Sequence, residues 1–166
     1  VRGITDPAAP AIETPSGARI SYGELIARTG RMANALVSLG VSPGDRIAVQ
    51  VEKSVEAIIL YLATVRAGAV FLPLNTGYTP AEIGYFVGDA APALFVCDPA
   101  RAESLTEAAG TARLLTLGAD GQGSLTDASE TQPEAFATVP RAAGDLAALL
   151  YTSGTTGRSK GAMLTH

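Results

Sequence analysis

The stretch "RIAVQVEKSVEAIILYLATVRAGAVFLPL", residues 46–74, decides the fold class. It opens with a run rich in β-branched residues, 46–51, which predicts a short strand. The next segment, 54–68, is apolar on nearly all sides and closes on a glycine, which predicts a buried helix. A second apolar run, 69–74, predicts another strand, with Pro73 near its end. Strand, helix and strand in this order form a βαβ unit, whose two strands run parallel.

A helix is predicted ahead of this unit, from Ser21 to Gly40. Ser21 and Glu24 have the spacing of a capping box, in which the two residues satisfy free backbone N–H groups of the first turn. Gly40 is a typical helix end. The apolar residues of the segment fall on one helical face, which is expected to be the buried one: Tyr22, Leu25, Ile26, Met32, Ala33, Leu36 and Val37.

The alternation of strands and helices continues after residue 74. Thr79, Pro80 and Glu82 supply a cap, a first-turn proline and a capping-box partner for a helix that ends near Ala90. The other predicted elements are a strand at 93–98, a helix from Asp98 to Gly110, a strand at 112–117 and a strand at 145–151. The strand segments are mostly apolar, as parallel strands buried on both faces are. We therefore predict an α/β protein, with βαβ units on a mostly parallel sheet and helices on both faces.

Residues 118–144 interrupt this pattern. The segment is rich in Gly, Ser, Thr and acidic residues, and it predicts a long surface connection with little regular structure. The sequence shows no internal repeat and no second domain boundary, so residues 1–166 are interpreted as one unit.

Composition excludes several classes of protein. With 166 residues, 47% of them hydrophobic, the chain can bury a sizeable core. A net charge of −4 and the lack of a basic stripe argue against a nucleic-acid partner. No apolar run approaches the ~18 residues of a membrane span, which argues against a membrane partner and favours a cytoplasmic protein. The single cysteine, Cys97, lies in an apolar run and is expected to be a buried thiol.

The stretch "YTSGTTGRSKG", residues 151–161, contains the candidate ligand-binding residues. It follows the last predicted strand, and no Asp or Glu occurs from Tyr151 to His166. Glycines let backbone N–H groups approach phosphate oxygens, hydroxyls donate further hydrogen bonds, and Lys160 adds a positive charge. This composition suits a polyphosphate, and a solvated turn is the alternative that composition leaves open.

The loop is not a Walker A motif. Gly154 and Gly157 are three residues apart, and Lys160 is followed by Gly161 where a Walker A motif has a magnesium-binding hydroxyl. The residues after the lysine, "GAMLTH", predict a strand, whereas a Walker loop leads into a helix.

The sequence "YTSGTTGRSKGAMLTH", residues 151–166, resembles the phosphate-binding signature of the adenylate-forming superfamily, which includes acyl-CoA synthetases, nonribosomal peptide adenylation domains and luciferases. Residues 20–49 and 65–75 resemble two further blocks of that superfamily in the same order. Ser159 departs from the pattern, which usually has proline there, and should leave the loop slightly less rigid. The resemblance implies that the chain is part of the large N-terminal domain of such an enzyme.

The resemblance also implies a site. It assigns phosphate binding to seven residues: Thr152, Ser153, Gly154, Thr155, Thr156, Gly157 and Lys160. The implied reaction joins a carboxylic acid to CoA at the expense of ATP, with Mg²⁺, through an acyl-adenylate. The segments 52–79 and 157–164 look most like malonyl-CoA synthetases, which implies malonate or methylmalonate as the acid.

Members of this superfamily run to several hundred residues, so the chain is expected to be an N-terminal fragment that is inactive alone. The resemblance places the catalytic lysine and the magnesium ligand further downstream, and hence no catalytic or metal-binding residue in 1–166. Two other functions stay open: an adenylation domain that loads a carrier protein, and a non-catalytic nucleotide-binding module. We expect a solvated role for Arg158, no catalytic role for His166, and a plain turn at 75–78.

Overall fold

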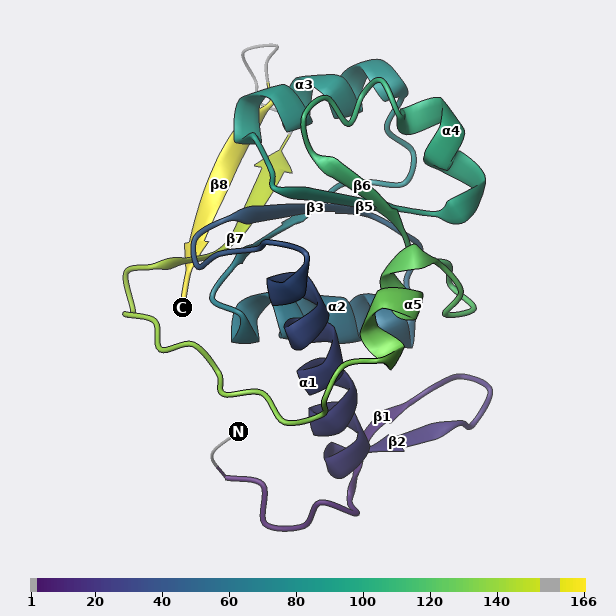
Figure 1. Cartoon of the computed structure of the whole chain (residues 1–166), viewed down its shortest axis with the longest axis vertical. Helices are drawn as coiled ribbons and strands as arrows, with labels where there is room; N and C mark the ends of the chain where they lie inside the picture. Colours follow the sequence, from purple (N-terminus) through teal and green to yellow (C-terminus); the bar gives the residue numbers. More distant parts are fainter. Residues whose placement is uncertain (1–2, 153–158) are drawn as a thin grey trace.

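A computed structural model of the chain describes residues 3–152 and 159–166. Its centre is a six-stranded sheet in the order β6-β5-β3-β4-β7-β8 (Figure 1). The strands are β3 (Arg46–Gln50), β4 (Val70–Pro73), β5 (Leu94–Cys97), β6 (Arg113–Thr116), β7 (Leu146–Thr152) and β8 (Lys160–Thr165). Neighbouring strands pair parallel from β6 to β7, and β8 pairs antiparallel to β7. The predicted mostly parallel sheet is confirmed.

Helices cover both faces of the sheet, as predicted (Figure 1). One layer consists of α1 (Tyr22–Ser38), α2 (Val55–Arg66) and α5 (Ser124–Glu130); the other consists of α3 (Pro80–Ala90), the 3-10 turn η1 (Pro99–Arg101) and α4 (Ala102–Leu105). Because side chains alternate along a strand, β3 contributes to both layers. Ile47 and Val49 pack with the first layer, and Ala48 packs with the second.

Of the two predicted capping boxes, the one at α3 is complete, and the one at α1 shows only the bond to Ser21. The Ser21 hydroxyl accepts a hydrogen bond from the backbone N–H of Glu24 at the start of α1, at 3.2 Å. Thr79 and Glu82 form a complete capping box at the start of α3. These two caps fix where the helices begin, and the second one fixes how α3 leaves the carboxyl end of β4.

Some apolar helix residues predicted to be buried are exposed. Tyr22 and Val37, at opposite ends of α1, are 38% and 49% exposed and lie outside the core cluster of the first layer. On α2, Ile58 and Tyr61 are 43% and 41% exposed. α2 therefore buries one side only, and the prediction of a helix buried all round is wrong.

Residues 118–144 contain a helix that the sequence analysis did not predict. α5 spans Ser124–Glu130, and its Leu125 is fully buried in the first layer. The prediction of little regular structure is therefore wrong for these residues. After α5 the chain crosses the outside of the first layer as an extended strap, residues 131–144, and then enters β7.

Two further differences concern the helix after β5 and the N-terminal part of the chain. The helix expected from Asp98 to Gly110 is limited to η1 and α4, and turns follow from residue 106. A two-stranded antiparallel hairpin, β1 (Pro10–Glu13) and β2 (Arg19–Ser21), precedes α1 and was not predicted. In the part of the chain that the structure describes, no helix combines the length and the apolar character needed to cross a membrane.

Candidate functional site

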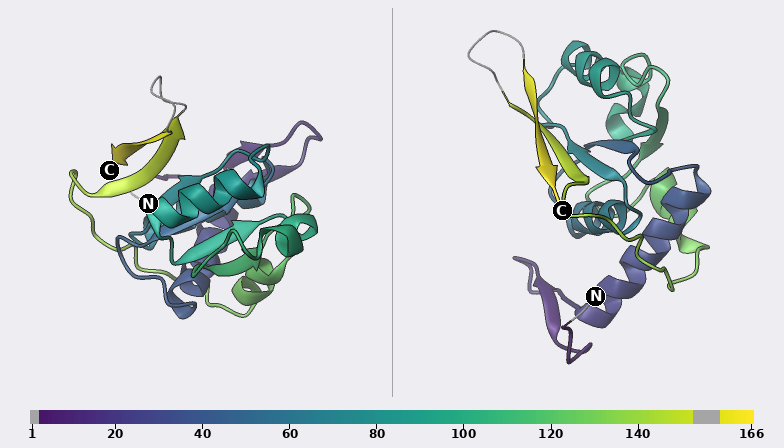
Figure 2. Two further views of the ribbon diagram at one scale, coloured as in Figure 1. Left: turned by 90° about the horizontal axis from the view of Figure 1, so that it is seen from above. Right: turned by 90° about the vertical axis from the view of Figure 1, so that its left-hand side faces the viewer.

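The candidate phosphate loop, residues 151–161, joins β7 to β8. The two strands form an antiparallel hairpin whose register places Thr152 opposite Lys160. Figure 2 shows this hairpin at the side of the molecule, extending away from the rest of the sheet. The loop follows the carboxyl end of β7, and in open α/β sheets ligands bind outside the carboxyl ends of the parallel strands.

Two of the seven predicted phosphate-binding residues are described. Thr152 and Lys160 are both exposed, one at each end of the loop. The other five lie outside the described residues: Ser153, Gly154, Thr155, Thr156 and Gly157. Arg158, which the sequence analysis assigned to solvent, lies outside them as well. The register thus brings together the two described members of the set.

The chemistry of the described residues fits an anion. Lys160 carries a positive charge at the mouth of the hairpin, and the Thr152 hydroxyl can donate a hydrogen bond from the opposite strand. No acidic residue occurs in the sequence from Tyr151 to His166. An approaching phosphate group therefore meets donors and a cation, and no carboxylate from this stretch repels it.

Helix α3 supports the loop from one side. The ring of Phe86, which is 3% exposed, packs against the ring of Tyr151 with 4.6 Å between centroids. The rings of Tyr78 and Tyr85 also pack against the ring of Phe86, with 4.9 and 5.4 Å between centroids. Aromatic pairs at such distances add to the stability that area burial gives. The four rings fix the end of β7 against α3.

Two hydrogen bonds join α3 to the ends of the loop. The Tyr151 hydroxyl donates to the carboxylate of Asp89, and the Tyr85 hydroxyl donates to the backbone carbonyl of Ser159 at 3.4 Å. Burial, and next the bond to Asp89, raise the pKa of Tyr151 well above its ordinary value, so its hydroxyl stays protonated. The sequence analysis missed Tyr85 and Asp89, because they lie on a helix whose apolar pattern gave no reason to single them out.

The polar segment 75–78 is a plain turn, as expected. The backbone N–H of Gly77 donates to the Asn75 side chain at 2.8 Å. Gln50 donates to the Asn75 carbonyl at 2.7 Å, and Arg101 donates to the Thr76 carbonyl at 2.7 Å. These contacts tie the ends of β3 and β5 to the turn that leads into α3. Several backbone carbonyls of the turn are thus used within the fold.

Two other features lie away from the loop. A groove of about 880 Å³ runs between α2 and the β1–β2 hairpin, but neither Thr152 nor Lys160 lines it, and its walls are mainly apolar. Cys97 is fully buried, so the predicted buried thiol is confirmed, and burial raises the pKa of this thiol to about 11. Among the described residues, no three His, Cys, Asp or Glu side chains are grouped to hold a metal ion.

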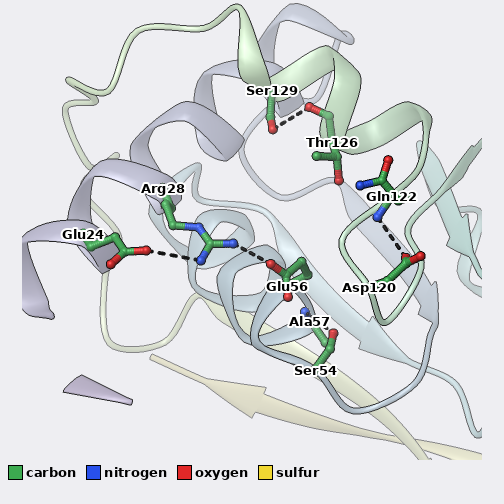
Figure 3. Close-up of polar contacts among 9 residues, drawn as sticks. All are labelled: Glu24, Arg28, Ser54, Glu56, Ala57, Asp120, Gln122, Thr126 and Ser129. Atoms are coloured by element: carbon green, nitrogen blue, oxygen red, sulfur yellow. Dashed lines mark hydrogen bonds and ion pairs between the residues drawn. The ribbon is translucent and has the colours of Figure 1, made fainter. Parts of the chain in front are cut away.

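A charged cluster between α1 and α2 is structural. Arg28 bridges Glu24, at 3.6 Å, and Glu56, at 2.5 Å (Figure 3). One positive and two negative side chains give the cluster a net charge of −1, which does not favour an anionic ligand. Near them, the Ser129 hydroxyl donates to the Thr126 carbonyl within α5. This cluster joins elements of the first layer, on the side of the sheet opposite α3.

Known proteins resemble this chain along most of its length. The family model described as "AMP-binding enzyme" matches residues 4–166. A feruloyl-CoA synthase from Amycolatopsis is 37% identical over 150 residues, which are 90% of this chain and 29% of that protein. The phosphinothricin tripeptide synthetase PhsB from Streptomyces viridochromogenes is 32% identical over 160 residues, which are 96% of this chain and 13% of that protein.

Among solved structures, MatB from Rhodopseudomonas palustris, determined with ATP bound, is 60% identical and has a TM-score of 0.93. The likeness covers 98% of this chain and 33% of the MatB chain. The chain therefore spans a third or less of the length of each of these three relatives.

Proposed function

Because the chain belongs to the family of AMP-binding enzymes, we propose that it forms the N-terminal part of an ATP-dependent carboxylic acid–CoA ligase. In the proposed reaction a carboxylate attacks the α-phosphate of ATP, which gives an acyl-adenylate and releases pyrophosphate. The thiol of CoA then attacks the acyl carbon, the thioester forms, and AMP leaves.

The observation that carries the proposal is the pairing of Thr152 with Lys160 at the mouth of a loop that contains no carboxylate. In this proposal all seven predicted residues, Thr152 to Gly157 and Lys160, bind the β- and γ-phosphates. They stabilise the negative charge that develops on the departing pyrophosphate. Lys160 contributes most because a charge-assisted hydrogen bond is stronger than one from a neutral hydroxyl.

Mg²⁺ and CoA require residues from the rest of the protein in this proposal. The described residues offer no cluster of three metal-binding side chains, so we assign Mg²⁺ to the phosphates of ATP and to carboxylates outside this chain. The catalytic residues of the second half-reaction are likewise assigned to the remainder of the protein. The 166 residues supply the phosphate loop and the sheet that positions it.

We propose malonate, or its methyl-substituted relative, as the acid. The proposal rests on the resemblance of residues 52–79 and 157–164 to malonyl-CoA synthetases, and the 60% identity to MatB exceeds the 37% identity to feruloyl-CoA synthase. In this proposal the contact to the second carboxylate of malonate is made by the rest of the protein.

A second candidate is an adenylation domain that transfers the acyl group to a carrier protein. The 32% identity to a tripeptide synthetase favours it, because that match covers 96% of this chain. The two candidates share the first half-reaction and differ in the thiol that accepts the acyl group. The acceptor therefore separates them: free CoA for the ligase, and a carrier-protein phosphopantetheine thiol for the alternative.

The test uses the full-length protein with ATP, Mg²⁺ and four acids: malonate, acetate, benzoate and a long-chain fatty acid. We expect ATP–pyrophosphate exchange with malonate in the absence of CoA, and malonyl-CoA when CoA is added. A complete lack of exchange with every acid would contradict the ligase proposal. A higher kcat/KM for benzoate or the fatty acid than for malonate would retain the family and remove the malonate assignment.

A further inference from the structure

Helix α3 contacts both ends of the phosphate loop. Asp89 accepts a hydrogen bond from Tyr151 where the chain enters the loop, and Tyr85 donates one to the carbonyl of Ser159 where the chain leaves it. Tyr85 and Asp89 are four residues apart in α3, so both project from one face of the helix. Phe86 lies next to Tyr85 and packs on Tyr151, which makes the two contacts parts of one assembly.

We propose that α3 is a clamp for the phosphate loop, in which Tyr85 and Asp89 are positioning residues for ATP. The proposal rests on the proposed function, since it assigns the clamp to the same site. Neither residue is placed in contact with substrate. Each acts through the loop, Asp89 through Tyr151 and Tyr85 through the backbone of Ser159.

The physical basis is the need to hold Thr152 and Lys160 opposite each other at the ends of β7 and β8. Ser159 lies between two glycines, Gly157 and Gly161, and glycine restricts the backbone least of all residues. Donors that bind a polyphosphate must be held close to their productive positions, because a donor that becomes ordered only on binding contributes less affinity. The contacts to Tyr151 and Ser159 hold the neighbouring Thr152 and Lys160 in position before ATP arrives.

The two contacts differ in strength. The Tyr151–Asp89 bond has an ionised acceptor, and the raised pKa of Tyr151 keeps its hydroxyl a donor through the working range of pH. The Tyr85–Ser159 bond joins two neutral groups and is long, at 3.4 Å. Loss of the Asp89 contact should therefore have the larger effect on the KM for ATP.

The experiment uses four variants of the full-length protein. Tyr85→Phe keeps the ring that packs on Phe86 and removes the hydroxyl. Asp89→Ala removes the acceptor, and Asp89→Asn keeps an oxygen that can accept from Tyr151. Tyr22→Phe is the matched control, because within the described residues the Tyr22 side chain forms no hydrogen bond to another group and lies at the start of α1, away from the loop.

Two readouts are measured. In ATP–pyrophosphate exchange we expect the KM for ATP to rise about 2- to 5-fold in Tyr85→Phe and about 10-fold in Asp89→Ala. The KM for malonate and the rate of thioester formation from preformed acyl-adenylate should be unchanged. Asp89→Asn should restore most of the loss. The second readout is the rate of tryptic cleavage after Arg158 and Lys160, which should rise in the same order.

The outcomes separate the two proposals. If the unmodified protein shows no exchange but cleavage rises in Tyr85→Phe and Asp89→Ala, the clamp stands and the ligase proposal fails. If exchange is present while both variants match Tyr22→Phe in KM and in cleavage, the clamp is overturned. An equal rise in the KM for ATP and for malonate would also overturn it, since that result indicates a general disturbance of the fold.

Discussion

Gly30 of α1 lies directly against the backbone carbonyl of Glu134, so close that a Cβ at position 30 would overlap the oxygen. The contact belongs to a larger set between α1 and the strap, residues 131–144. Asn34 donates to the carbonyls of Pro133 and Ala135, at 2.8 and 3.0 Å. The strap is therefore held by specific contacts, although its sequence has the composition of a loose connection.

This relationship predicts that Gly30→Ala destabilises the protein. The new methyl group has no space unless the strap or α1 shifts, and overpacking of this kind costs roughly 1–3 kcal/mol. Alanine favours a helix over glycine by about 1 kcal/mol, which offsets part of the loss. We expect a lower urea midpoint at an unchanged slope of the unfolding free energy against urea.

Gly88→Ala is the matched control. Gly88 is exposed on α3, and a Cβ there would meet no other atom within 4 Å. The substitution should raise the unfolding free energy by roughly 0.5–1 kcal/mol through helix propensity alone. If Gly30→Ala also stabilised the protein, the close approach of the strap to α1 would be wrong.

Much of the fold could be predicted because the relevant signals are local. Ile47, Ala48 and Val49 form a continuous apolar run because their strand is buried on both faces. The capping box at Thr79 marks the first turn of α3. α5 could not be predicted in this way. Its sequence "SLTDASE" consists mainly of residues that favour caps and turns, and its place depends on the burial of Leu125 against distant elements.

The candidate site, too, could be predicted from the sequence only in part. Its position after a strand, its glycines and its lysine are readable in residues 151–161. The support from Tyr85 and Asp89 is not, because Asp89 and Tyr151 are 62 residues apart. They meet because β7 lies between β4 and β8 in the sheet, and Tyr151 of β7 faces the layer that contains α3. A pairing set by sheet order leaves no local pattern in the sequence.

The 166-residue chain alone is expected to catalyse no adenylation. It spans 33% of the MatB chain, and the proposal assigns magnesium binding and the catalytic residues to the remainder of the protein. The measurement is AMP release by the purified chain with ATP, Mg²⁺, CoA and the four acids. Turnover comparable to that of the full-length protein would show that 1–166 carries the whole active site.

Cys97 should resist alkylation in the folded protein. It is fully buried, and at pH 8 a thiol with a pKa of about 11 is ionised in roughly one molecule in a thousand. Iodoacetamide labelling, followed by mass spectrometry of the peptide that contains Cys97, should be slow in buffer and fast in 8 M urea, an excess chosen to unfold the chain. Equal rates in the two solutions would contradict the burial.

The same thiol predicts a loss of stability at high pH. Burial is the main cause that raises the pKa of Cys97 above the unfolded value, which is about 8.5. The contribution is complete below pH ~8.5 and declines as the pH rises toward about 11, because the unfolded chain then releases a proton that the folded chain retains. Between pH 7 and pH 10 the urea midpoint should therefore decrease more for the unmodified protein than for Cys97→Ala.

Lys160→Met should impair the first half-reaction selectively. The substitution keeps most of the side-chain length and removes the charge, and a charge-assisted hydrogen bond contributes roughly 1.5–3 kcal/mol. ATP–pyrophosphate exchange by the full-length protein should fall about ten- to a hundred-fold. Thr155→Ala and Thr156→Ala should each cost less, because neutral donors bind phosphate more weakly.

The control for this prediction is Lys53→Met, which removes the only other lysine of the chain. Lys53 is exposed just before α2 and lines the groove to which neither Thr152 nor Lys160 contributes. Its loss should leave exchange within about two-fold of the unmodified protein, as expected for a solvated charge.

The second half-reaction gives the sharper comparison. Pyrophosphate leaves before CoA reacts, so a group that binds the β- and γ-phosphates has no partner in that step. Supplied with preformed acyl-adenylate and CoA, Lys160→Met should form thioester at close to the normal rate while its ATP–pyrophosphate exchange stays depressed. Equal losses in both half-reactions would mean that Lys160 supports the fold of the β7–β8 hairpin, and that the loop is not the pyrophosphate site.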